Sequence, residues 1–339
     1  MLDNYSYILD VLSEVMIAFR QKRNSGMNHK RIMEWLKEFE LAIAKSHASI
    51  KAFANRCSQL NSRIERLIRE TDFKAVYDSK MELFSVGYDI ERDRLIKSYY
   101  DLLASEARQA SFVAIAKGDI PQKHWFRLGR ALTMVEDLKV LLSWSGTMFE
   151  YMMPLLIMKN YEYTLLDETY TAVVATQMQY GEQRRVPWGV SESGFYAFDL
   201  HLNYQYKAFG VPKLGLKRGL VNDMVVAPYA TALALPVNPA AAVKNLEMLI
   251  AEGADGEYGL YEAIDYTPER LPQKKRRMLV KSFMAHHQGM ILLALNNFLN
   301  DNIMQNRFHS APMVKATELL LQERTPKKEI FLKEHTEKV

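Results

Sequence analysis

The chain has 339 residues, of which 48% are hydrophobic and 25% are charged. Both fractions are close to those of ordinary globular proteins, so the composition excludes a disordered chain and a fibrous repeat. The 44 basic and 40 acidic residues are spread along the sequence and give a net charge of only +4. This balance argues only weakly for an anionic partner, and we expect no nucleic acid.

A single cysteine, Cys57, permits neither an intramolecular disulfide nor a cysteine-based metal cluster, which favours a reducing compartment. Acidic residues at Asp3, Asp10 and Glu14 interrupt the apolar pattern of the N-terminus, so no signal peptide is predicted. The apolar stretch at 151–158 is far shorter than the roughly 20 residues of a spanning helix. We therefore expect a cytoplasmic protein.

The first predicted element is a long amphipathic helix over residues 29–70. Its apolar side chains recur at alternating steps of three and four, which places them on one stripe and predicts a packing seam: Ile50, Phe53, Cys57, Leu60, Ile64 and Leu67. Two short β-prone runs, 73–77 and 83–88, then predict a small hairpin around residues 78–80. Residues 1–72 are thus expected to form a helical lead-in.

The remainder of the chain is predicted to be mostly helical. Helical spacing or strong helix formers mark 98–117, 125–135, 146–158, 164–183, 239–252, 282–300 and 312–323. Asn238 and Pro239 form an expected helix start, and Gly253 an expected end. Loops dense in glycine, proline and aromatic residues separate the helices, at 186–195, 206–219, 226–229 and 256–266. Residues 73–326 are therefore expected to form an all-α toroid with fewer than twelve helices, and 327–339 a solvated, charged tail.

The most suggestive of these loops contains Glu192. Enzymes that act on sugars usually need two carboxyl groups at the glycosidic bond and aromatic faces that hold the rings. Trp188 supplies a ring, and Ser191 and Ser193 flank Glu192, where they could orient its carboxylate. The alternative is that Glu192 stabilises the N-terminus of a following helix through its charge. The loop by itself leaves these two interpretations about equal.

A second acidic loop places Glu262 and Asp265 among tyrosines. Tyr258 and Tyr261 precede the two acids, and the spacing of three puts both acids on one side of a helical turn. Tyrosines and carboxylates together are typical of sugar-binding subsites. A solvated loop is the alternative, and binding is favoured over direct catalysis.

Glu106 is the third candidate acid. It lies beside the apolar stripe of the helix predicted at 98–117, where burial of a carboxylate is costly unless it is paired or protonated. A protonated Glu106 could donate a proton to a leaving group. A salt bridge to Arg108 or Arg130 is the structural alternative, and the residues alone favour it.

Two adjacent histidines and one basic pair complete the candidates. His286 and His287 point about 100° apart on their helix, so they cannot share a metal ion, and no metal site or cofactor is predicted. Bonding of one histidine to sugar hydroxyls or to a carboxylate, and packing in the core, are equally compatible with the pattern. Lys217 and Arg218 lie in a glycine-containing loop that lacks the spacing of a phosphate-binding loop, and they could contact substrate hydroxyls.

Several longer segments, taken in the same order, resemble one enzyme family. The segments are 98–108, 124–130, 142–151, 188–193, 204–212, 226–231, 285–290 and 316–324, and together they are similar to the glucoamylase-like domain of cyclic β-1,2-glucan synthases. The resemblance covers residues 73–326. It implies an (α/α)₆ barrel that rearranges linear β-1,2-glucan by transglycosylation with retention of configuration.

The resemblance also assigns residues. Glu192 matches the family's nucleophile and Glu106 its acid/base, with Glu262 as a competing acid. Trp188, Tyr204, Tyr206, Tyr258, Tyr261, Asp265, His286, His287, Lys217 and Arg218 are expected to bind the glucan. Related barrels hydrolyse β-1,2-glucan, and a non-catalytic glucan-binding module is a further alternative. The membrane glycosyltransferase and phosphorylase-like parts of such synthases are not in this sequence; they are expected partners, and association with an inner membrane could come through them.

Overall fold

The computed structural model describes residues 4–21, 26–135 and 138–325. The chain divides into two compact units, Met1–Asp72 and Phe73–Val339. The predicted charged tail at 327–339 lies outside the described residues. Within the described part of the chain, no helix has both the length and the apolar character that a membrane span requires.

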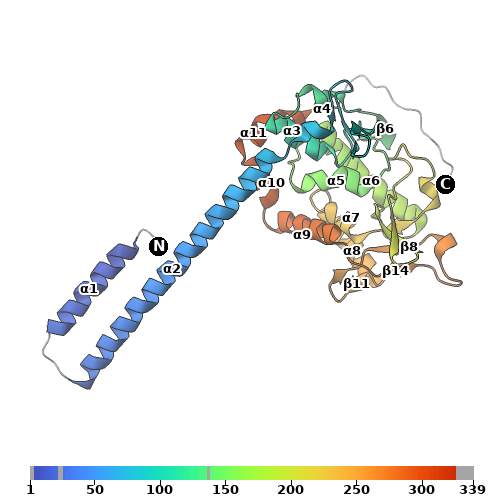
Figure 1. The fold of residues 1–339 in the computed structure, drawn as a ribbon. Helices are drawn as coiled ribbons and strands as arrows, with labels where there is room; N and C mark the ends of the chain where they lie inside the picture. The colour runs from blue at the N-terminus through green and yellow to red at the C-terminus, as the bar shows by residue number, and fades with distance from the viewer. Residues whose placement is uncertain (1–3, 22–25, 136–137, 326–339) are drawn as a thin grey trace. The chain divides into compact units, whose positions relative to one another are not determined.

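The smaller unit is a hairpin of two helices, α1 (Tyr5–Gln21) and α2 (Met27–Glu70), shown in blue in Figure 1. The predicted long helix is confirmed, but its packing seam is not where we expected it. Leu12 and Met16 of α1 pack against Leu36 in the first half of α2, whereas Phe53 and Leu67 are 66% and 64% exposed. The physical reason is length, because a helix of 17 residues cannot cover one of 44 residues.

The larger unit begins with the predicted hairpin. A short 3₁₀ turn, η1 (Phe73–Val76), leads into β1 (Tyr77–Asp78), which pairs with β2 (Leu83–Ser85). The Asp78 carboxylate accepts hydrogen bonds from the amides of Lys80 and Met81, which stabilises the turn. The hairpin is thus confirmed. A third strand, β5 (Tyr99–Tyr100), extends this sheet, and β3 (Tyr88–Asp89) pairs with β4 (Arg94–Leu95).

Two predicted helices are shorter than expected. Residues 98–107 form β5 and a turn, and α3 begins only at Arg108 (Arg108–Lys117). Helix α4 (Lys123–Arg127) ends where the strand β6 (Leu132–Val135) soon begins, and β6 pairs with β7 (Leu138–Leu141), which contacts α6. Residues such as Val135 and Val140 are compatible with a strand as well as with a helix, so packing against the rest of the fold determines which of the two forms.

The remaining predicted helices are confirmed in position, although several are short. They are α5 (Met148–Met152) with η2 (Met153–Leu156), α6 (Leu165–Arg184), α8 (Pro239–Ala251), α9 (Ala285–Leu299), and α11 (Pro312–Thr317) with η5 (Glu318–Gln322). Two more, α7 (Pro228–Leu233) and α10 (Ile303–His309), were not predicted. Asn238 caps α8 by accepting a hydrogen bond from the amide of Ala241, as the sequence indicated.

More strands are present than the single hairpin we expected. They lie in the loops between helices, where short antiparallel pairs satisfy backbone groups that no helix could satisfy. These strands are β8 (Ser193–Phe198) with β9 (Tyr204–Lys207), the sheet of β10 (Val225–Val226), β13 (Ala263–Asp265) and β14 (Met278–Val280), and the pair of β11 (Asp255–Gly256) and β12 (Gly259–Leu260). The 3₁₀ turn η3 (Leu220–Asn222) precedes β10, and η4 (Pro268–Arg270) lies between β13 and β14 in sequence.

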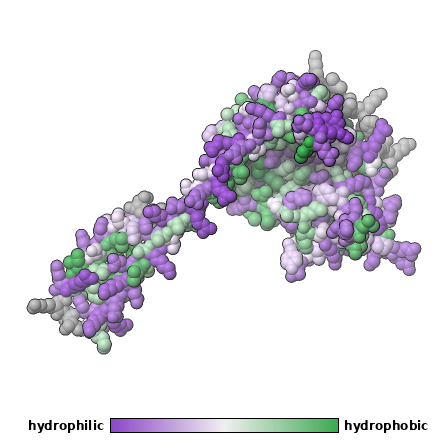
Figure 2. Space-filling model, viewed as in Figure 1, coloured by the Kyte–Doolittle hydropathy of each residue, from purple (hydrophilic) through white to green (hydrophobic). Residues whose placement is uncertain are grey.

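The core of the larger unit is built where its helices meet. Helix α7, all six residues of which are buried, contacts α5, α8 and α9, while β8 contacts β13 and β14 (Figure 1). On the face shown in Figure 2 the surface of this unit is mostly hydrophilic, with hydrophobic side chains gathered near α5. Residues 73–135 and 138–325 thus hold nine α-helices around a large apolar cluster, and a smaller cluster of Phe84, Ala114 and Ile120 lies in the same unit.

The close approach of two loops generates a prediction about stability. A Cβ atom on Gly210 would lie 1.6 Å from the carbonyl oxygen of Ser145, so Gly210→Ala must displace the backbone. We expect it to lower the free energy of unfolding by about 2 kcal/mol or more in denaturant titrations.

Gly289 provides the matched control. It lies within α9 and a Cβ atom there would meet nothing within 4 Å. Gly289→Ala should therefore stabilise the protein by about 0.5–1 kcal/mol. Equal effects of the two substitutions would contradict the packing of these loops.

Candidate active site

The loop that carries Glu192 is held by buried side chains on both sides. The side-chain amide of Gln177 in α6 donates to the carbonyl of Val190 and accepts from its amide, both at 2.8 Å. Asn245 in α8 binds the amide and the carbonyl of Trp188 in the same way. The Trp188 ring itself is buried in the core. It fixes the loop there instead of offering an exposed face for a sugar ring.

A chain of hydroxyl groups fixes the backbone at Glu192. The amide of Phe149 donates to Ser191 Oγ, Ser191 Oγ lies 2.7 Å from Tyr229 Oη, and Tyr229 Oη donates to the carbonyl of Glu192. Ser191 therefore orients the main chain, whereas we had expected it to orient the carboxylate of Glu192. Ser193 Oγ is buried without a partner among the described residues.

The carboxyl group of Glu192 is half-buried in an acidic environment. Burial, followed by the charges of Glu106 and Glu150, raises its pKa to about 7. The residue is followed directly by strand β8, so the alternative in which Glu192 stabilises the start of a helix is wrong. The site therefore brings Glu192 and Glu106, far apart in sequence, into electrostatic contact.

Glu106 lies in the turn before α3 and not inside a helix. Ser105 Oγ donates to its Oε2 at 3.3 Å. The salt bridges we considered as an alternative are made elsewhere, because Arg130 pairs with Glu323. Arg108 is buried and its guanidinium donates to the carbonyls of Ser105, Glu150 and Tyr151.

Tyr100 and Glu150 also interact electrostatically with this pair, and the sequence had not indicated either of them. Together with Glu106 and Glu192 they form what we call the acidic cluster. Burial and the charges of Glu106 and Glu192 raise the pKa of Tyr100. Glu150 is buried at the start of α5, where its carboxylate accepts hydrogen bonds from Ser143 Oγ and from the amides of Ser145 and Thr147. Its spacing from Thr147 is that of a capping box, a signal that could have found its structural role.

Glu262 is enclosed and fully engaged. Its side chain is inaccessible to solvent, Oε1 accepts from the amide of Gly194 at 3.0 Å, and Oε2 lies 2.9 Å from His287 Nδ1. A solvated loop is therefore wrong, and so is a helical turn, because residues 263–265 form strand β13. With both oxygens occupied by protein donors, Glu262 supports the strand that follows Glu192.

Asp265 is equally buried and supports the same strand. Its Oδ2 accepts from the amide of Tyr196, its Oδ1 accepts from the amide of Thr267, and Arg270 pairs with it at 2.7 Å. These contacts explain how a fully buried carboxylate is tolerated. The acid holds β8 in place and is not directed at a ligand.

The other predicted binding residues differ in accessibility. Tyr206 on β9 is 41% exposed, and burial, followed by the charges of Glu192 and Glu262, raises its pKa. Tyr258, His286 and Arg218 are exposed, and Tyr261 and Lys217 are half-buried, while Tyr204 Oη accepts from the amide of Lys281. His287 is buried. Among the described residues, no group of three histidine, cysteine or acidic side chains could hold a metal ion.

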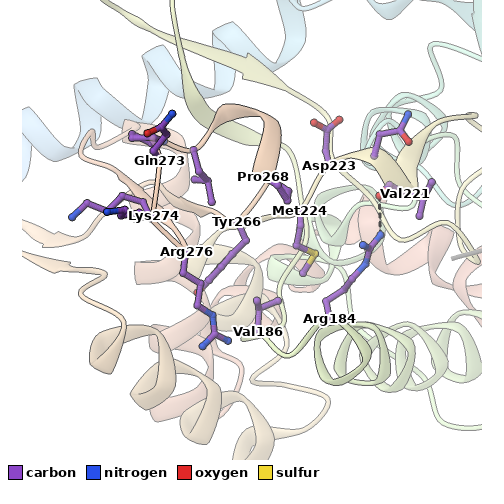
Figure 3. A pocket seen from close by; sticks show the side chains of 14 residues that line it. Arg184, Val186, Val221, Asp223, Met224, Tyr266, Pro268, Gln273, Lys274 and Arg276 are labelled. Atoms are coloured by element: carbon purple, nitrogen blue, oxygen red, sulfur yellow. Dashed lines mark hydrogen bonds between the residues drawn. The ribbon is translucent and has the colours of Figure 1, made fainter.

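A cavity of 530 Å³, shown in Figure 3, is lined by residues that do not belong to the acidic cluster. Arg184 at the end of α6 lines it and donates to the carbonyl of Val221, with Asp223 and Tyr266 nearby and three basic residues from the loop 274–276. None of the acids predicted to be catalytic lines this cavity. The acidic cluster therefore remains the candidate active site.

The Glycoamylase family model matches residues 98–312, which include Glu106, Glu192 and Glu262. The chain belongs to the Glycoamylase family. This glycoamylase-family chain is 42% identical over 279 residues to the cyclic beta-(1,2)-glucan synthase NdvB of Rhizobium meliloti (strain 1021). The match covers 82% of the chain but only 10% of that protein. The resemblance to the cyclic β-1,2-glucan synthases is thereby confirmed.

Two solved structures share the fold of this glycoamylase-family chain. A glucoamylase-like protein of Bacteroides caccae ATCC 43185 superposes with a TM-score of 0.54 at 18% identity, covering 92% of the chain and 70% of that structure. A beta-1,2-glucanase of Parabacteroides distasonis superposes with a TM-score of 0.58 at 14% identity, covering 92% and 44%. The predicted fold class, a helical barrel of the (α/α)₆ type, is confirmed.

The raised pKa of Glu192 predicts how stability depends on pH. A carboxyl that retains its proton in the folded state but loses it in the unfolded state destabilises the fold as pH rises from its ordinary pKa of 4.5 to about 7. The glutamine in Glu192→Gln cannot ionise. The melting temperature of this variant minus that of the wild type should therefore increase as the pH rises across this window and stay constant above it.

The control for this measurement is Glu162→Gln. Glu162 is exposed, and its removal should give no such trend in the melting temperature. A constant difference between Glu192→Gln and the wild type from pH 4.5 to 7 would contradict the electrostatic environment of Glu192.

Proposed function

We propose that this domain cleaves and re-forms β-1,2-glucosidic bonds, with Glu192 and Glu106 as the reacting pair. The observation that carries the proposal is the half-buried carboxyl of Glu192 beside Glu106, where burial, followed by the charges of Glu106 and Glu150, raises the pKa of Glu192 to about 7. Two carboxyls with environments that separate their titration are what retaining and inverting glycosidases require. The relatives support the substrate, since one is named a cyclic beta-(1,2)-glucan synthase and another a beta-1,2-glucanase.

In the proposed reaction the carboxylate of Glu192 attacks the anomeric carbon of a glucose unit. The bond from that carbon to the oxygen of the next unit breaks, and Glu106 gives its proton to the leaving oxygen. In the second step the 2-hydroxyl of a glucan attacks the glycosyl-enzyme and returns its proton to Glu106. Configuration is retained because the anomeric carbon is inverted twice.

The opposite assignment of roles is the second candidate. A raised pKa is typical of the group that acts as the acid, and the pKa of Glu192 is raised to about 7. Glu192 remains our nucleophile because the segment at 188–193 matches the family's nucleophile loop.

We also propose that different parts of the chain have different roles. Residues 73–326 form the catalytic barrel, and residues 1–72 form a helical lead-in. Tyr204, Tyr206, Tyr258, Tyr261 and His286 bind the glucan through rings and hydroxyl or imidazole groups that reach the surface. Because the chain spans about a tenth of its relative, the glycosyltransferase and phosphorylase-like parts of such a synthase are its expected partners.

The number of reducing ends, measured during incubation with linear β-1,2-glucan, distinguishes transglycosylation from hydrolysis. Transfer to a glucan hydroxyl, whether cyclic or linear, leaves the number of reducing ends unchanged, whereas hydrolysis adds one for every bond cut. We expect the chain-length distribution to change at a constant number of reducing ends. A rising number would instead assign the domain as an endo-β-1,2-glucanase.

Substitution of the pair should abolish this change. Glu192→Gln and Glu106→Gln should each lower the rate by about 100-fold or more, because each removes a group that reacts or transfers a proton. Glu247→Gln, an exposed position on α8, is the matched control and should keep full activity. If wild-type protein binds glucan but never alters it, the domain is a non-catalytic binding module.

Added azide separates the two assignments of roles. In Glu192→Gly azide takes the place of the missing nucleophile and gives a glycosyl azide of inverted configuration. In Glu106→Gly azide attacks the glycosyl-enzyme and gives the retained configuration. The reverse pattern, read from the anomeric signals by NMR, would exchange the roles of the two glutamates.

A further inference from the structure

Three side chains form a chain of polar contacts from the core to the candidate active site. Glu262 Oε2 lies 2.9 Å from His287 Nδ1, and His287 Nε2 lies 3.4 Å from Tyr206 Oη. Glu262 and His287 are both buried, whereas Tyr206 is 41% exposed. Only the tyrosine can therefore reach a ligand.

The register of the β8–β9 hairpin explains how the three groups meet. Tyr206 on β9 lies directly opposite Gly194 on β8, and opposite residues point to the same face of the sheet. A Cβ atom on Gly194 would lie 3.2 Å from the Cγ atom of Glu262. Because Gly194 has no side chain, Glu262 has the space to reach the face of the hairpin that carries Tyr206.

The same group of side chains contacts the main chain of Glu192. The ring of Tyr229 stacks on His287 with centroids 3.8 Å apart and an interplanar angle of 16°. Its hydroxyl donates to the carbonyl of Glu192, and Glu262 accepts from the amide of Gly194, two residues further on. The imidazole of His287 is therefore fixed in tilt and position beside the reacting loop.

We propose that Glu262 and His287 are positioning residues that orient the Tyr206 hydroxyl, so that its oxygen accepts a hydrogen bond from a glucan hydroxyl next to Glu192. This inference rests on the proposed function and adds a substrate-orienting device to it. Glu262 then acts at a distance from the reaction, and Tyr206 is the residue that touches the sugar.

The direction of the contacts follows from the donors available. A carboxylate can only accept, so Nδ1 of His287 carries the proton that is shared with Glu262. In the neutral imidazole Nε2 is then an acceptor, and the Tyr206 hydroxyl donates to it. The lone pairs of the Tyr206 oxygen are left for a sugar hydroxyl. At 3.4 Å this contact is long, and such contacts often tighten only when substrate binds.

The first test reads the protonation of His287 without any glucan. In protein labelled with ¹⁵N-histidine, NMR should show His287 protonated at Nδ1 and unprotonated at Nε2. Tyr206→Phe should shift the Nε2 signal, whereas Tyr163→Phe, at an exposed tyrosine elsewhere in the chain, should not. A proton on Nε2, or an Nε2 signal that ignores Tyr206→Phe, overturns the inference.

The second test is a double-mutant cycle on glucan rearrangement. His287→Asn keeps a side-chain N–H near Nδ1 for Glu262 but removes Nε2. Loss of one hydrogen bond to substrate should lower kcat/KM about tenfold in Tyr206→Phe and in His287→Asn alike. If His287 acts through Tyr206, the double variant should lose no more than either single variant.

The outcomes separate this inference from the function on which it rests. Wild-type protein that leaves glucan unchanged overturns the proposed function, whatever the NMR shows. Active wild-type protein with losses that multiply to about 100-fold in the double variant overturns the inference alone. His201→Asn, at an exposed loop histidine, is the control and should keep full activity.

Discussion

Buried carboxylates have to be matched by hydrogen-bond donors or by cations, because the charged form is otherwise too costly away from water. Glu150, Glu262 and Asp265 are matched by backbone amides, hydroxyls, an imidazole and a guanidinium. Burial raises the pKa of Glu150 despite these donors, and burial followed by the charges of Glu106 and Glu150 raises the pKa of Glu192 to about 7. The larger unit thus places a half-buried carboxyl with a raised pKa at the candidate site.

The matched acids give this site its rigidity. Glu150 holds the loop 143–147, while Glu262 and Asp265 bind the amides of Gly194 and Tyr196 on the strand that follows Glu192. Gln177 and Asn245 secure the same loop from α6 and α8. A reacting group has to be held within a fraction of an ångström, and buried bonds from several elements achieve this better than a free loop would.

Strands in a mostly helical domain serve the same purpose. The β8–β9 hairpin contacts the sheet of β10, β13 and β14, and it connects the loop of Glu192 to the histidine-bearing start of α9 through Glu262. The fold shared with the Bacteroides caccae and Parabacteroides distasonis structures supplies the helices around it. Function in such a scaffold depends on the loops, which differ most between proteins of one fold.

The sequence by itself determined the long helix of the lead-in, the hairpin after it, most helices of the larger unit and the segments by which the family could be recognised. These follow from local spacing, capping and turn chemistry, as at Asn238 and Asp78, which act over a few residues. Only the tertiary structure decided that 98–107 is not helical, that Glu262 is engaged by Gly194 and His287, and that Tyr100 and Glu150 lie near Glu192. Those facts depend on which groups meet across long stretches of chain, and the cost of an unmatched buried charge exists only once such groups have met.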